Sequence, residues 1–122
     1  MKRLIAALLF VTCASAPAFA FSYPVSGSYG VSNETAPGPI DCTGKRVIRF
    51  EEERRFDNGG GVPDYRVIDL VHEDDDVAFK IREEFNTGQI RAQYQYLLRL
   101  IDSDGIEMTP VSGPALKLKR CL

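Results

Sequence analysis

The sequence predicts an all-β protein, a small antiparallel up-and-down β-barrel of about seven or eight strands. The first observation is residues 89–102, QIRAQYQYLLRLID, in which apolar and mostly polar residues alternate. This period of two is typical of a strand with one face on a core and the other in water. The second observation is that turn-forming residues recur every eight to twelve positions or so, with no convincing helical pattern between them.

Residues 1–20 have the pattern of a secretory signal peptide. Two basic residues precede an apolar run of about ten residues and a small-residue stretch that ends at Ala20. The run is shorter than the roughly 18 apolar residues that a membrane span needs, and Pro17 interrupts the stretch that follows. We therefore expect cleavage after Ala20, a single domain over residues 21–122, a periplasmic or secreted location and no membrane span in the mature chain.

The charge balance argues against nucleic acid as a partner. The chain has 15 Lys and Arg against 17 Asp and Glu, a net charge of −2. Without Lys2 and Arg3 the balance is 13 against 17, so the mature chain is acidic. A nucleic-acid-binding domain would instead show a basic excess.

Two cysteines remain after the predicted cleavage, Cys42 and Cys121. An even number without CxxC spacing in an exported chain predicts one structural disulfide. Closing a loop of about 80 residues contributes roughly 4–5 kcal/mol in the chain-entropy model, before any strain is subtracted. The bond would join the region before the first long strand to the last strand, which favours closure of the sheet.

The remaining strands follow from alternation and turn residues. Residues 33–44 form the longest connection between strands. This loop is either a functional loop or a structural tether held by Cys42. Gly88 occupies the left-handed position of a hairpin turn. Strands are predicted at 21–32, 45–56, 62–72, 77–85, 89–102, 106–109 and 115–122.

Two of these strands have an irregular pattern. In residues 45–56, Phe50 and Phe56 share one parity with Glu52 and Arg54, so the strand either runs past the edge of the core or is reset by a bulge near residues 51–53. Residues 62–72 have apolar side chains on both faces. Short links make sequential strands pair. Such a meander either packs as two sheets or closes into a barrel, and closure removes exposed edges. The result resembles the lipocalins in architecture only, because their sequence motifs are missing.

Neither a metal site nor a catalytic site is predicted. Residues 72–76, HEDDD, are consecutive and point in different directions, so we interpret them as a solvated turn and not as a calcium site. Residues 102–105 match part of an EF-hand loop, but Leu100 and Val111 would occupy ligand positions. The sequence has one histidine, His72, and no Ser or Cys nucleophile motif with which it could form a catalytic arrangement. We expect a protein that is not an enzyme and uses no cofactor.

An aromatic cluster on the inward faces has two interpretations. A barrel of this size either fills itself with these side chains or keeps a cavity for one small ligand, and we favour the filled core. The candidate cavity residues are Tyr94, Tyr96, Phe50, Phe79 and Phe85.

Arginines on the predicted outer face suggest a second kind of site. Interspersed with acids, they either form cross-strand ion pairs or contact a partner protein. The candidate contact residues are Arg54, Arg55 and the turn glycines Gly59, Gly60 and Gly61.

These observations favour a non-catalytic exported barrel of the bacterial envelope that binds another macromolecule, for example as a hydrolase inhibitor. The alternative is a carrier of a small apolar ligand inside the barrel. An enzyme is the least favoured class.

Overall fold

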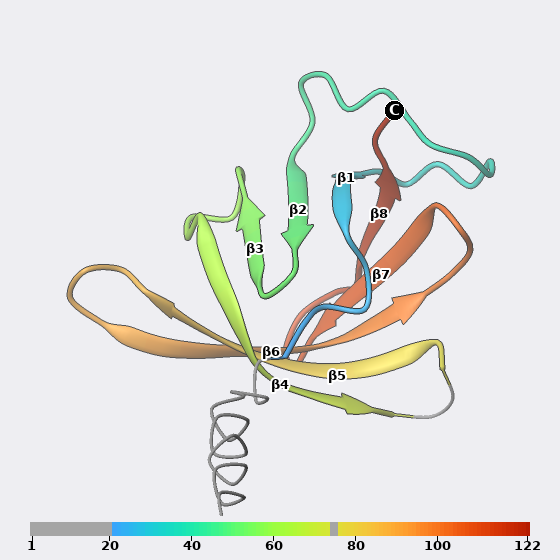
Figure 1. The fold of residues 1–122 in the computed structure, drawn as a ribbon. Coiled ribbons are helices and arrows are strands. Elements are labelled where there is room, and N and C mark those ends of the chain that lie inside the picture. Colours follow the sequence, from blue (N-terminus) through green and yellow to red (C-terminus); the bar gives the residue numbers. More distant parts are fainter. Residues whose placement is uncertain (1–20, 74–75) are drawn as a thin grey trace, which may run out of the picture.

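The computed structural model describes residues 21–73 and 76–122, which form a closed antiparallel β-barrel of eight strands (Figure 1). The predicted signal peptide lies outside the described residues. Each strand pairs with the next in the sequence, and β1 pairs with β8 to close the barrel. The strands are β1 Gly27–Val31, β2 Val47–Glu51, β3 Arg54–Asp57, β4 Asp64–His72, β5 Ala78–Asn86, β6 Arg91–Leu100, β7 Gly105–Pro110 and β8 Leu116–Arg120.

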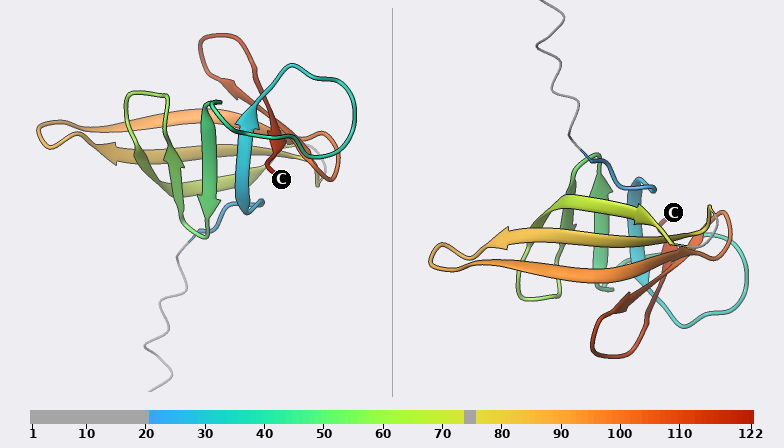
Figure 2. Two further views of the ribbon diagram at one scale, coloured as in Figure 1. Left: turned by 90° about the horizontal axis from the view of Figure 1, so that it is seen from above. Right: turned by 90° about the horizontal axis from the view of Figure 1, so that it is seen from below.

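The up-and-down topology predicted from the sequence is confirmed. In such a barrel the connections after β3, β5 and β7 lie toward one end, which we call the mouth. Figure 2 shows how steeply the strands are inclined to one another and how far the β5–β6 hairpin extends from the body. The other end carries the short turns after β2, β4 and β6.

The alternation in β6 places its even-numbered residues in the barrel interior, as predicted. Tyr96 and Leu98 are fully buried, whereas Gln95 and Arg99 are exposed. A continuous apolar cluster fills the barrel between the strands. Its most deeply buried members are Tyr29, Ile48, Phe50, Ile81, Tyr96, Leu98 and Leu118.

The single strand predicted over residues 45–56 is wrong, because the chain reverses after Glu51. Glu51 pairs with Arg54, so Glu52 and Glu53 form a two-residue hairpin turn, with Glu52 at a φ of 52°. Two-residue turns with positive φ usually carry Asn, Asp or Gly, and glutamate gives no such signal. As a result Arg55 in β3 lies in the interior, where the predicted pattern placed it on the outer face.

A β-bulge explains the apolar residues on both faces of β4. The register with β5 shifts between Val67 and Asp69. Val67 before the bulge is buried, and Leu70 after it packs against the core cluster. Because the bulge inserts one extra residue, odd-numbered side chains before it and even-numbered side chains after it point to the same face.

The predicted disulfide is present, with Cys42 and Cys121 sulfurs 2.05 Å apart. It fixes the β1–β2 connection against the C-terminal strand (Figure 1), where Ile40 forms a parallel bridge with Cys121. The disulfide lies directly over Gly30, because a Cβ on that residue would be 2.6 Å from the Cys42 sulfur. The Lys119 ammonium also donates a hydrogen bond to the Ala36 carbonyl. The long connection is therefore a strap along the β1–β8 seam.

Removing the disulfide should destabilise the barrel strongly. We expect the Cys42→Ser, Cys121→Ser double variant to lose up to about 4–5 kcal/mol of unfolding free energy, because the open chain gains entropy when unfolded. Urea denaturation with and without reductant measures this. Thr43→Ser, which changes the exposed neighbour of Cys42, is the control. An unchanged midpoint in the double variant would contradict a stabilising role.

Gly88 has a φ of +96°, as its predicted position requires, and no heavy atom lies within 4 Å of where a Cβ would be. We therefore expect Gly88→Val to destabilise the protein by about 1–3 kcal/mol through backbone strain alone. Gln89→Val, in the same exposed turn, should change stability by less than about 0.5 kcal/mol. Equal effects of the two substitutions in thermal denaturation would show that the turn relaxes.

Candidate functional site

A buried ion pair lies in the middle of the barrel. The Arg55 guanidinium in β3 donates from Nε to Oε2 of Glu83 in β5 and from Nη2 to Oε1, both at 2.7 Å. The two side chains are 2% and 0% exposed. This bidentate geometry is the strongest form of the Arg–carboxylate interaction.

Two tyrosine hydroxyls complete the hydrogen bonding of Glu83. Tyr23, in the segment before β1, and Tyr96 in β6 each donate to Glu83 Oε2 at 2.8 Å. Glu83 thus accepts four hydrogen bonds from three different parts of the chain. In the described part of the protein, no buried side-chain nitrogen or oxygen lacks a hydrogen-bond partner.

A second bidentate pair continues this network toward the mouth. Arg46, just before β2, donates to both Asp57 oxygens at 3.0 and 2.8 Å, and the Gly59 amide donates to Asp57 Oδ1 at 3.0 Å. Asp57 Oδ2 lies 3.7 Å from Arg55 Nη1. Charges therefore alternate along the row Arg46, Asp57, Arg55 and Glu83, and the two positive and two negative groups balance.

The pKa values reflect this pairing. Burial alone would raise the pKa of Asp57, but the hydrogen bonds from Arg46 and the Gly59 amide outweigh it and hold the pKa below its ordinary value. Burial opposes the charge of Arg55, yet the hydrogen bonds to Glu83 keep its pKa above the ordinary range. Burial is the main cause that raises the pKa of Tyr23 and of Tyr96, and the negative charge of Glu83 is the second. Both hydroxyls therefore keep their protons.

An open pocket with a volume of about 330 Å³ lies at the mouth, above this network. We call it the mouth pocket. The Arg55 guanidinium stacks on the Tyr65 ring at 3.9 Å, and Tyr94 lies beside Tyr65 with 5.9 Å between ring centroids. The lining is partly polar and partly apolar. The polar side chains and tyrosines are Arg46, Arg55, Asp57, Tyr65 and Tyr94, and the apolar residues are Ile48, Met108, Pro110 and Leu116.

The β5–β6 hairpin extends beyond its neighbouring strands (Figure 2). Pairing of β5 with β4 reaches only Glu84, and pairing of β6 with β7 begins at Tyr96. Residues 93–95 still pair with the part of β5 that β4 also contacts, so residues 85–92 form a two-stranded extension. The ring of Tyr65 in β4 packs on Phe85 at 5.2 Å and on Tyr94 at 5.9 Å, which supports the base of this extension.

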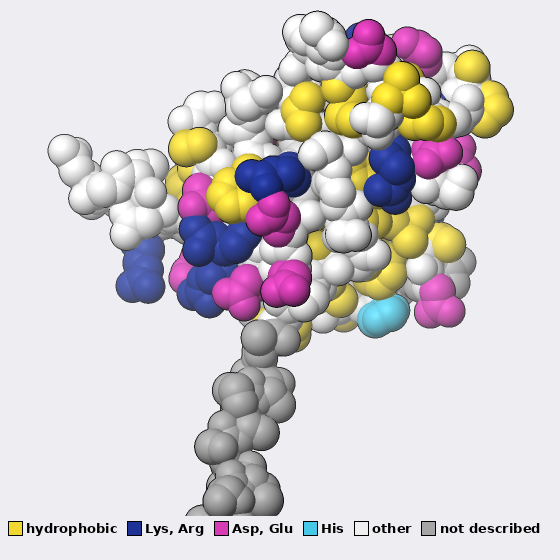
Figure 3. All heavy atoms as spheres, turned by 45° about the horizontal axis from the view of Figure 1, so that its top comes forward, with side chains coloured by type: hydrophobic (Ala, Val, Ile, Leu, Met, Phe, Trp, Pro, Cys, Tyr) yellow, Lys and Arg dark blue, Asp and Glu magenta, His cyan; other side chains and the backbone are white. Residues whose placement is uncertain are grey.

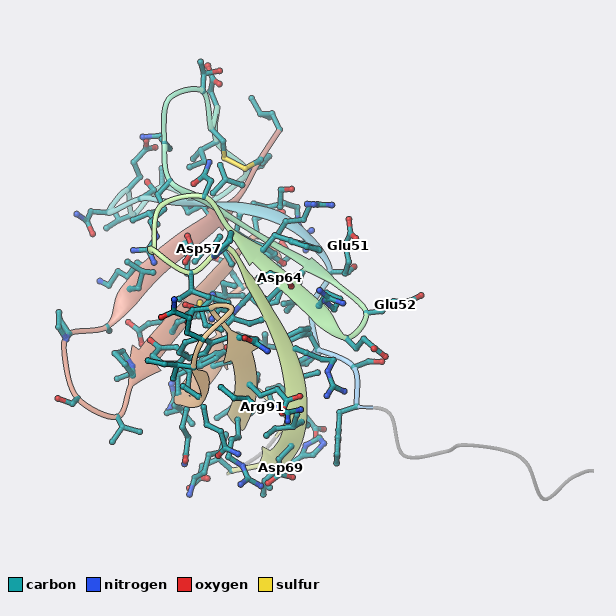
Figure 4. All side chains as sticks on the ribbon, turned by 90° about the vertical axis from the view of Figure 1, so that its left-hand side faces the viewer. Glu51, Glu52, Asp57, Asp64, Asp69 and Arg91 are labelled. Atoms are coloured by element: carbon teal, nitrogen blue, oxygen red, sulfur yellow. A yellow bond between two sulfur atoms is a disulfide. The ribbon has the colours of Figure 1, made fainter. Side chains whose placement is uncertain are left out.

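Ion pairs cover the outer wall of β3–β5 (Figure 3). Arg54 pairs with Asp64, Arg66 with Glu84, and Arg82 with Asp69, all at least partly exposed. Figure 4 views this wall with Asp64 and Arg91 labelled. Exposed pairs of this kind contribute little stability individually, about 0–1 kcal/mol.

The structure separates the predicted cavity residues. Phe50, Phe79 and Tyr96 belong to the packed core, whereas Tyr94 lines the mouth pocket. Phe85 lies at the base of the hairpin extension and borders a smaller groove on the outer wall.

The predicted contact residues are also divided. Arg54 is exposed, and Gly59, Gly60 and Gly61 form the exposed loop between β3 and β4, with Gly60 at the edge of the mouth pocket. The placement of Arg55 on the outer face is wrong, because the Glu52–Glu53 turn directs its side chain into the barrel.

Glu83, Asp57, Arg46, Tyr23 and Tyr65 were not predicted as site residues. A signal for Glu83 was present, because it shares the inward parity of Ile81 and Phe85. Asp57 gave no such signal, since its orientation depends on the unrecognised turn.

The acidic stretch after β4 gives no evidence of a cation site. His72 packs its ring on Phe79 with 4.9 Å between centroids. Residues 74–75 lie outside the described residues. Among the residues that are described, no three His, Cys, Asp or Glu side chains are grouped so as to hold a metal ion. Nor does this part of the chain include a helix long and apolar enough to cross a membrane.

No protein-family model, curated protein or solved structure matches this chain in the comparisons with known proteins.

Breaking the buried pair should be far more damaging than breaking a surface pair. We expect Arg55→Met and Glu83→Gln each to lower the unfolding free energy by about 3–5 kcal/mol, because each leaves a buried group uncompensated. The double variant should be less destabilised than the sum of the two, which urea denaturation measures as a coupling energy. Arg54→Met with Asp64→Asn is the matched exposed pair, with an expected effect below about 1 kcal/mol. Similar effects for both pairs would contradict the structural role of the network.

Proposed function

We propose that this protein is a non-catalytic binding protein of the cell envelope that contacts another macromolecule with the tip of the β5–β6 hairpin and the neighbouring mouth loops. The observation that carries the proposal is the two-stranded extension of residues 85–92. A hairpin without neighbouring strands is marginally stable and adds nothing to closure of the barrel. Contact with a partner accounts for it.

The tip has the properties of a contact element. Residues 86–91 are all exposed, and Ile90 at the tip is 61% exposed. Arg91 follows it with a largely exposed side chain. Arginine is enriched among the residues that dominate binding energy at interfaces, and burial of the exposed Ile90 side chain against a partner would add a hydrophobic contribution.

The Tyr65, Phe85 and Tyr94 rings support the base of the hairpin from three strands. A supported contact element loses less conformational entropy on binding. The loop of Gly59, Gly60 and Gly61 and the exposed Val111 after β7 lie at the same end of the barrel. A projecting tip suits a concave site, so the partner we propose is a hydrolase whose cleft receives the hairpin. The disulfide supports an oxidising location such as the periplasm or the exterior.

Site-specific crosslinking tests this proposal. A photoreactive residue at Gln89 should yield one discrete adduct in envelope extracts, competed by the unlabelled protein and lost in Ile90→Asp. The same photoreactive residue at Lys117, exposed on the outer wall of β8, is the matched control. If the partner is a hydrolase, its turnover should fall on adding the barrel and recover with Ile90→Asp. Identical adducts from both positions, or none from Gln89, would refute hairpin binding.

A further inference from the structure

The mouth pocket holds hydrogen-bond donors that the protein leaves unused. Arg55 is not one of these donors, because its side chain is only 2% exposed and Glu83 binds its Nε and Nη2. Arg46 uses Nε and Nη2 on Asp57, which leaves its Nη1 unengaged by that carboxylate. The Tyr94 hydroxyl has no hydrogen bond to the described residues, and its ring lines the pocket.

The acceptors beside the pocket are already occupied. Asp57 accepts two hydrogen bonds from Arg46 and one from the Gly59 amide, and its side chain is 2% exposed. Glu83 accepts four hydrogen bonds and is fully buried behind Arg55. A ligand therefore meets the Arg46 guanidinium, whose side chain is 37% exposed, and the Tyr94 hydroxyl, whereas both carboxylates are buried. Such a lining selects a ligand that carries an acceptor and disfavours a cation.

Part of the pocket lining is apolar. Ile48, Met108 and Leu116 come from three different strands, and Pro110 adds a fourth apolar residue. The volume of about 330 Å³ is at the lower end of the roughly 300–1,000 Å³ of small-molecule sites. A lining that combines apolar residues with hydrogen-bond donors matches a small amphipathic molecule.

We propose that the mouth pocket binds a small carboxylic acid with an apolar tail. The carboxylate accepts hydrogen bonds from Nη1 of Arg46 and from the Tyr94 hydroxyl, and the tail lies along Met108 and Leu116. A charge-assisted hydrogen bond from the Arg46 guanidinium favours the ionised acid over a neutral amide. The site is separate from the hairpin tip, so this proposal does not depend on partner binding.

Titration of the folded protein with hexanoate, followed by amide chemical shifts, tests the proposal. We expect saturable binding with a Kd below about 10 mM, with the largest shifts at residues around the pocket. Hexanamide and hexylammonium should bind at least about tenfold more weakly, a difference of about 1.4 kcal/mol. Equal binding of hexanamide would overturn recognition of the carboxylate. No saturable shift at pocket residues would overturn the site itself.

Three variants locate the binding. Tyr94→Phe removes a hydroxyl with no partner in the described protein and should weaken hexanoate binding by about three- to tenfold while the fold is retained. Arg46→Gln should weaken it further, and Arg49→Gln on the outer wall is the control of equal charge change. If Arg46→Gln does not fold, Tyr94→Phe alone decides. Wild-type affinity in folded Tyr94→Phe would refute the assignment.

Ile90→Asp separates this proposal from the proposed function, because it should abolish the crosslinked adduct and leave hexanoate binding unchanged. Loss of hexanoate binding in Ile90→Asp would contradict the independence of the two sites.

Discussion

The bidentate pair of Arg55 and Glu83 is the interaction on which the arrangement of this barrel depends. Glu83 has almost no exposed surface, and a lone carboxylate there would be strongly destabilising. The barrel can bury it only because Arg55, Tyr23 and Tyr96 all reach the same two oxygens. These partners lie before β1, in β3 and in β6. The pair therefore requires distant parts of the chain to be in register at once.

Such a network favours one arrangement of strands more than it adds net stability. Replacing a buried ion pair with apolar residues is often neutral or stabilising, whereas breaking it is costly. In this barrel, a shift of β3 by one residue would turn Arg55 outward and bring Phe56 inward, leaving Glu83 unpaired. The Phe56 ring instead lies outside, under the Arg49 guanidinium at 4.5 Å. The hydrophobic pattern of β3 alone would favour a register with Phe56 inside. The Arg55–Glu83 pair favours the observed register instead.

The same network divides the barrel into two parts with different properties. On one side of it the interior is packed with apolar side chains, many of them less than 2% exposed. Toward the mouth, the partly exposed Arg46 lies beside an open pocket, and Tyr65 links that pocket to the base of the hairpin extension. The features that we propose to bind ligands are therefore positioned by side chains that also hold the barrel together.

The sequence by itself determined the strand class, the alternation of β6, the turn at Gly88 and the disulfide. These features depend on local spacing or on the pairing of only two candidate cysteines. Only the tertiary structure determined which side chains of β3 face the barrel interior. The Glu52–Glu53 turn carries no typical turn residue, so the sequence does not show that Arg55 and Asp57 face inward. Arg55 and Glu83 are 28 positions apart. Each residue alone is typical of a solvated strand face. Only closure of the barrel brings the two together, so that each compensates the buried charge of the other.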